Sequence, residues 1–92
     1  MDFHKIWREQ YEVTPTIRER FGVKSALDYL VGEKLLSFAN AADRDHEFAA
    51  ELPCFQAAVW EIFNPYELRG YVASVKPSAR RKGLQKLLYV SA

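Results

Sequence analysis

The chain has 92 residues, of which 49% are hydrophobic and 14% aromatic, and its formal net charge at pH 7 is only +1. This length predicts a single domain with a thin core, and no apolar run approaches the ~18 residues that a membrane span requires. Because Cys54 is the only cysteine, an internal disulfide is excluded, and we expect a cytoplasmic protein without a membrane partner.

The apolar residues between positions 3 and 21 keep helical spacing and predict the first helix. Gly22 follows it and offers the left-handed conformation that is common after a helix end. Pro15 interrupts the pattern. It either kinks this helix or begins a second piece of helix with Thr14 as its cap.

A second helix is predicted near Ser25, because Ser25 and Asp28 form a capping-box-like pattern. The apolar residues from Leu27 to Ala42 then mark one broad stripe, which predicts the clearest helix of the chain. Gly32 inside this stripe costs about 1 kcal/mol relative to alanine, so we expect it to mark a close crossing of two helices.

A third helix is predicted over the apolar stripe from Phe48 to Ile62, with Asp43 or Asp45 as its cap. Pro53 falls within this stripe without shifting its phase. We therefore expect either a kinked helix or a short turn followed by a helix that begins at Pro53.

A fourth helix is predicted to begin after Asn64, because Asn64, Pro65 and Glu67 supply a cap, a first-position proline and a third-position carboxylate. Lys76 and Pro77 end this helix, since the residue before a proline avoids helical geometry. Ser78 is expected to cap a last helix near the C-terminus.

These helices predict an all-α bundle of four to five helices in a single domain over residues 1–92, with residues 76–92 as a basic C-terminal element. This element has five basic residues and no acid; since the whole chain has 13 basic and 12 acidic residues, 8 basic and 12 acidic residues precede it. Three explanations fit this charge split. The basic element binds an anionic partner, it pairs with the acidic body or a neighbouring subunit, or it is a solvated end. The candidate contacts for an anion or a nucleic acid are Lys24, Ser25, Arg80, Arg81, Lys82 and Lys86.

The segment RERFGVKSALDYL (18–30) resembles the turn and second helix of bacterial helix-turn-helix regulators, in which a serine opens the recognition helix. The resemblance covers 13 of the 92 residues. It implies that Lys24, Ser25, Asp28 and Tyr29 face the major groove of DNA. Of these, Asp28 would lie opposite phosphates, and the apolar residues that follow are more typical of a core helix.

The sequence predicts no enzyme, because no acid, base and nucleophile lie in a recognisable arrangement. His4 and His46 are 42 residues apart and are expected to be solvated, while Cys54 is expected to be a small buried hydrophobic residue. Residues 43–54 begin like a calcium loop but carry Phe48 at the position that requires glycine. We therefore predict no catalytic, cofactor-binding or metal-binding residue and no small-molecule ligand.

The large apolar content exceeds what a monomer of this size easily buries, so we expect self-association or another protein partner. Aromatic side chains commonly anchor such interfaces. The candidates are Trp7, Tyr11, Phe55, Trp60 and Tyr71. The sequence thus predicts a non-enzymatic interaction or regulatory protein, expected to be a homodimer. The alternative is a small helix-turn-helix-like DNA-binding regulator that uses residues 18–30 and the basic C-terminus, with weak binding to nucleic acid.

Overall fold

A computed structural model of the chain describes residues 2–32, 35–37, 46–75 and 78–90. The predicted all-α class is confirmed, because these residues form helices, turns and short connections but no strand. The helices are α1 (Phe3–Phe21), α2 (Val23–Leu30), α4 (His46–Ile62), α5 (Pro65–Ser74) and α6 (Ser78–Leu88), and residues 35–37 are also helical.

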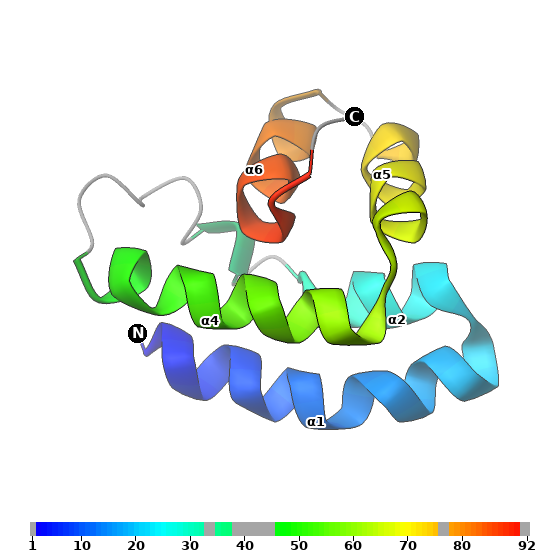
Figure 1. Ribbon diagram of the computed structural model, residues 1–92, viewed down its shortest axis with the longest axis horizontal. Coiled ribbons are helices and arrows are strands. Elements are labelled where there is room, and N and C mark those ends of the chain that lie inside the picture. Colours follow the sequence, from blue (N-terminus) through cyan, green and yellow to red (C-terminus); the bar gives the residue numbers. More distant parts are fainter. Residues whose placement is uncertain (1, 33–34, 38–45, 76–77, 91–92) are drawn as a thin grey trace.

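These five helices pack in a ring around one core, so that each contacts two others. α1 packs against α2 and α4, α4 packs against α6, α6 against α5, and α5 returns to α2. Figure 1 shows α1 and α4 lying side by side, with α5 and α6 standing above them. Each helix turns an apolar side inward, and burial of these residues is the main stabilising term of the fold. Among the fully buried side chains are Trp7, Leu27, Phe55, Leu68 and Leu87.

The first helix is continuous through Pro15, so the alternative of a second piece capped by Thr14 is wrong. Thr14 is buried inside α1, and its hydroxyl donates a 2.7 Å hydrogen bond to the backbone carbonyl of Gln10 in the preceding turn. Gly22 ends the helix with φ +94° and ψ 177°. The predicted positive φ at this glycine is confirmed, and it lets α2 begin at the very next residue.

The second helix is shorter than its apolar stripe predicts. α2 ends at Leu30, where Val31 leaves helical geometry, and a single helix to Ala42 is therefore wrong. Gly32 follows this end and marks no close crossing, because a Cβ added there would have no neighbour nearer than 4.0 Å. Periodicity misled the prediction because Val31 and Leu35 are both fully buried although α2 has already ended at Leu30.

The predicted capping box at the start of α2 is also wrong. Gly22 occupies the cap position without a side-chain bond, and Ser25 lies inside the helix. Asp28 instead accepts hydrogen bonds from Lys24 and from Tyr71 of α5. The remaining part of the predicted stripe, with the caps Asp43 and Asp45, lies outside the described residues.

The fourth predicted helix begins as expected. Asn64 Oδ1 accepts a hydrogen bond from the Glu67 backbone N–H at 2.9 Å, and Glu67 Oε1 accepts one from the Asn64 N–H at 3.1 Å. Pro65 is the first residue of α5. Glu67 also binds the guanidinium of Arg18 through two hydrogen bonds of 2.9 Å, which ties the start of α5 to α1. In α4, Pro53 lies inside a continuous helix, so no new helix begins there.

The basic C-terminal element is an integral part of the fold. Leu84, Leu87 and Leu88 of α6 are fully buried, so the element cannot be removed without opening the core. Arg81 donates hydrogen bonds to the carbonyls of Ala73 (3.3 Å) and Val75 (3.1 Å). These bonds give the backbone carbonyls at the end of α5 the partners that the helix itself does not supply. None of the described helices is long and apolar enough to cross a membrane.

Candidate functional site

Three of the five aromatic residues predicted to form an interface lie in the core. Trp7 is 1% exposed, Phe55 0% and Tyr71 6%, which leaves them no surface to offer a partner. Trp7 meets Phe55 edge to face with 5.5 Å between ring centroids, and Tyr11 packs on Trp7 at 5.8 Å. Such ring pairs explain how a chain of this size buries several of its large aromatic side chains. Trp60 remains at the surface, with 40% of its area exposed.

The outer face of α4 is largely apolar, with Glu61 as an acidic residue at its C-terminal end. Ala50, Cys54, Ala57 and Trp60 are exposed and recur every three or four residues, so they lie on one side of the helix. The prediction that Cys54 is buried is wrong, since the thiol belongs to this face. A surface helix normally presents charged and polar residues to water, and an exposed apolar stripe is therefore unusual.

Side chains of α4 also hold the end of α6. Trp60 Nε1 donates a 2.7 Å hydrogen bond to the carbonyl of Leu88, and Gln56 Nε2 donates one of 2.9 Å to the carbonyl of Lys86. Carbonyls in the last turn of a helix have no partner within the helix. Gln56 and Trp60 supply those partners, so Trp60 is tied to the C-terminal end of α6.

Tyr89 follows α6 in a conformation that favours glycine. Its φ is +58°, and the next N–H, that of Val90, donates a 3.3 Å bond back to the carbonyl of Gln85. This is the arrangement in which a helix ends with one left-handed residue, a position usually occupied by glycine. A side chain with a Cβ costs roughly 1 kcal/mol there. The strained residue carries a ring that is 73% exposed.

We call Gln56, Ala57, Trp60 and Tyr89 the aromatic patch. These four residues line a shallow hollow of about 350 Å³ between α4 and the end of α6, and its exposed lining is almost entirely apolar. Charges of opposite sign flank it in sequence. Glu61 is exposed on α4 next to Trp60, while Lys86 is exposed on α6 one turn before Tyr89.

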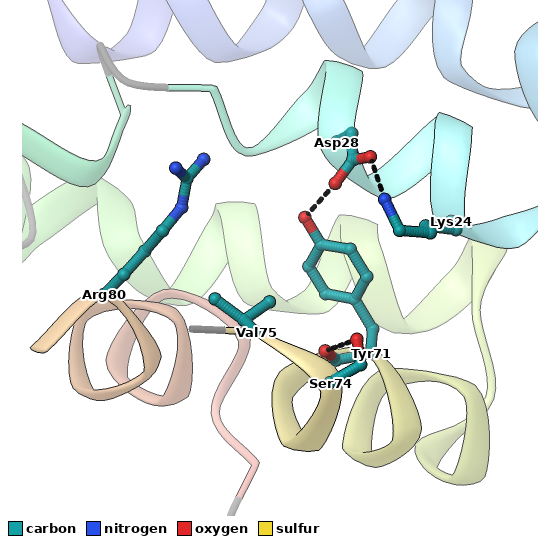
Figure 2. Close-up of a pocket in the computed structure, with 6 residues that line it drawn as sticks. All are labelled: Lys24, Asp28, Tyr71, Ser74, Val75 and Arg80. Carbon is teal, nitrogen blue, oxygen red and sulfur yellow. Dashed lines mark hydrogen bonds and ion pairs between the residues drawn. The ribbon is translucent and has the colours of Figure 1, made fainter. Parts of the chain in front are cut away.

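A second hollow, which we call the charged pocket, lies between α2, α5 and α6. It has a volume of about 320 Å³ and is lined by Lys24, Asp28, Tyr71, Ser74, Val75 and Arg80. Figure 2 shows Asp28 bound on both sides: Lys24 Nζ lies 2.8 Å from Oδ2, and the Tyr71 hydroxyl donates a 2.6 Å hydrogen bond to Oδ1. Arg80 reaches in from α6 on the opposite side.

The protonation states in the charged pocket follow from these contacts. Burial acts to raise the pKa of Asp28, but hydrogen bonds from Lys24 and Tyr71 and the positive charges of Lys24 and Arg80 outweigh it. The net effect lowers the pKa of Asp28, so this carboxyl is an anion at neutral pH. Burial, together with the hydrogen bond to Asp28, raises the pKa of Tyr71 well above its ordinary value of 10.0. Tyr71 is therefore a neutral donor.

Two of the six predicted anion contacts come together. Lys24 and Arg80 line the charged pocket although they are 56 positions apart. Ser25 is exposed on α2 and does not line the pocket, and Arg81 is engaged with the end of α5. The last two, Lys82 and Lys86, are exposed on α6.

The segment that resembles a helix-turn-helix spans the end of α1, Gly22 and α2. A helix-turn-helix joins its helices by a turn of about 3–4 residues, whereas a single residue separates α1 from α2. The side chains of Lys24 and Asp28 bind each other and face the charged pocket beside α5. Ser25 and Tyr29 are exposed.

The histidine His4 is not simply solvated as predicted. Its Nδ1 lies 2.5 Å from Glu51 Oε1, and the same oxygen accepts a 3.1 Å hydrogen bond from Trp7 Nε1. These contacts tie α1 to α4, while His46 is exposed at the start of α4. Within the described part of the chain, no three histidine, cysteine or acidic side chains gather in a metal-binding arrangement. No protein-family model matches the sequence, and comparisons with curated proteins and with solved structures find no match.

Proposed function

We propose that this chain is a non-enzymatic interaction protein that forms a homodimer through the aromatic patch and the apolar outer face of α4. The observation that carries the proposal is the conformation of Tyr89, whose φ of +58° holds an exposed ring beside Trp60. Glycine would remove the strain at this position. A ring that is largely in water contributes little to folding, so a binding role explains why the strain is tolerated.

A second copy of the chain fits this surface better than an unrelated partner. A two-fold axis through the patch brings α4 of each protomer to the region of α6 of the other, since such interfaces are self-complementary. The exposed Glu61 on α4 then approaches the exposed Lys82 on α6. This pairing would place one acid of the body against the basic end of the sequence. The small side chains of Ala50 and Ala57 also allow close approach of two helices.

The substitution Tyr89→Gly tests the proposal because strain and binding respond in opposite directions. We expect the monomer to gain about 1 kcal/mol in free energy of unfolding, while the dimer dissociation constant rises about tenfold to thirtyfold. Light scattering on eluting protein measures the mass against a 10.7 kDa monomer. Stability is compared at concentrations at which both proteins are monomeric.

Tyr66→Ala is the matched control, because Tyr66 is 80% exposed but lies at the start of α5, outside the patch. It should leave dimerisation unchanged. A wild-type chain that elutes as a monomer at every concentration would refute the proposal, as would a Tyr89→Gly variant that dimerises as tightly as wild type.

Cys54 provides an independent reporter without any substitution. It is the only cysteine of the chain, and its thiol is exposed on the outer face of α4 in the protomer. We expect its reaction with a bulky maleimide to slow as the protein concentration rises. In Tyr89→Gly the rate should stay constant over the same range. A wild-type rate that does not depend on concentration would exclude this face from the interface.

The alternative of a DNA-binding regulator rests on Lys24 and Arg80, which line one pocket. Two features of α2 make DNA binding the weaker proposal. Lys24 already binds Asp28, and a single residue, Gly22, connects α1 to α2. Titration with duplex DNA at ~50 mM salt tests it, since phosphate contacts are strongest at low salt. No binding there removes this alternative. We also propose a cytoplasmic location, because the single cysteine cannot form an internal disulfide.

A further inference from the structure

We infer that a trough beside the charged pocket is a binding site for a small uncharged aromatic molecule that carries one hydrogen-bond donor. The trough has a volume of about 280 Å³ and is lined by the start of α2 and by one side of α5. Its α5 residues include Tyr66, Gly70 and Ser74, which recur every four residues and therefore lie along the same side of the helix. None of the lining residues belongs to the aromatic patch, so the trough is distinct from the proposed dimer interface.

The size and the surface of the trough suit a small flat ligand. Most of its exposed lining is apolar, and sites for drug-sized molecules begin at about 300 Å³, so this volume suits one ring or two fused rings. Gly70 keeps the trough open, since nothing lies within 4 Å of a Cβ placed there. Tyr66 is 80% exposed, with the Arg69 guanidinium over one face of its ring at 5.6 Å from the centroid. The other face is open for an aromatic ligand to stack on.

The charges of the lining indicate that the ligand is uncharged. Lys24 and Glu67 are the charged residues of the lining, and each is paired within the protein. Lys24 Nζ lies 2.8 Å from Asp28 Oδ2, and Glu67 binds the Arg18 guanidinium through two hydrogen bonds of 2.9 Å. An ion that entered the trough would lose hydration without meeting an unpaired charge of the opposite sign. An uncharged molecule does not incur this cost.

The hydroxyl group of Ser74 selects a ligand that donates a hydrogen bond. Ser74 is exposed, and its hydroxyl donates a 2.7 Å hydrogen bond to the carbonyl of Tyr71. Because a serine hydroxyl has only one hydrogen, its oxygen can then act only as an acceptor. Figure 2 shows the Tyr71 hydroxyl turned toward Asp28, so we assign the acceptor role to Ser74. An aromatic N–H, as in indole, satisfies this acceptor while the ring fills the apolar part of the trough.

The test is a titration of the isotope-labelled protein with indole, followed by the chemical shifts of its backbone amides. We expect saturable shifts in α5 and at the start of α2, with a Kd of about 1 mM, as the affinity per atom of small ligands implies. Benzofuran has nearly the same shape but no N–H and should bind about threefold to tenfold more weakly. Indole-3-carboxylate keeps the N–H but adds a negative charge, and it should also bind more weakly than indole. No saturable shift with indole, shifts confined to α4 and α6, or tighter binding of the carboxylate overturns the inference.

Three variants test whether indole occupies the trough. Gly70→Leu fills it and should weaken indole binding at least about tenfold, whereas Ala73→Leu enlarges an exposed side chain of α5 outside the lining and should leave binding unchanged. Ser74→Ala should weaken indole about threefold to tenfold without affecting benzofuran, because only the bond to the N–H is lost. The amide spectrum of each variant shows whether the fold is retained. Equal effects of Gly70→Leu and Ala73→Leu overturn the site, and equal losses of indole and benzofuran in Ser74→Ala overturn the role of the hydroxyl.

Discussion

The same substitution, glycine to alanine, should have opposite effects at Gly70 and Gly22. Gly70 lies in the interior of α5, and a Cβ added there meets nothing within 4 Å. Alanine restricts the unfolded chain and favours the helix by up to about 1 kcal/mol over glycine. No packing is disturbed, so Gly70→Ala should raise the free energy of unfolding by about 0.5–1 kcal/mol.

Gly22 also has open space around its Cβ position, but its backbone differs. With φ +94° and ψ 177° it occupies a region that is essentially restricted to glycine. Alanine there should cost about 1–3 kcal/mol or force the junction between α1 and α2 to rearrange. The two variants should therefore differ by roughly 1.5–4 kcal/mol, the sum of the two effects.

Chemical denaturation followed by far-ultraviolet circular dichroism measures both variants under the same conditions. For a domain of this size each 1 kcal/mol corresponds to about 4–8 °C in Tm, so thermal unfolding checks the sign independently. Wild-type stability in Gly22→Ala would refute the backbone conformation at this junction. Destabilisation by Gly70→Ala would show that another group closely approaches α5 at this position.

Three further predictions concern the contacts that join the helices. Hydrogen bonds from Arg18 and from the Asn64 backbone lower the pKa of Glu67 below its ordinary value of 4.5. The stability from this carboxylate is present above the ordinary pKa and is lost as the pH falls through the lowered value. Denaturation between about pH 6 and pH 2 should show this loss, and it should be reduced in Glu67→Gln. The raised pKa of Tyr71 predicts that, of the five tyrosines, it ionises last in an ultraviolet titration. Tyr71→Phe should abolish that late step, and an unchanged profile would contradict the assignment. Removal of the residues after Val75 deletes three buried leucines worth about 2–5 kcal/mol each, so the truncated chain should show no cooperative unfolding transition.

The sequence by itself determined the features that depend on neighbouring residues. The cap at Asn64, the proline at the first position of α5 and the positive φ at Gly22 were predicted correctly, because each involves groups within a few positions of the chain. The helical class follows from apolar spacing for the same reason. The end of α2 was missed, since the apolar stripe continues beyond Leu30 although the helix does not.

Only the tertiary structure decided which face of each helix meets another helix. Periodicity marks an apolar side but does not name its neighbour, so Phe55 and Trp60 of α4 were equally good interface candidates until one proved buried and the other exposed. The positive φ and the exposure of Tyr89 had no local signal, because this helix end carries a tyrosine where glycine is usual. Both candidate sites combine residues from different helices, and packing of the whole chain is what brings them together.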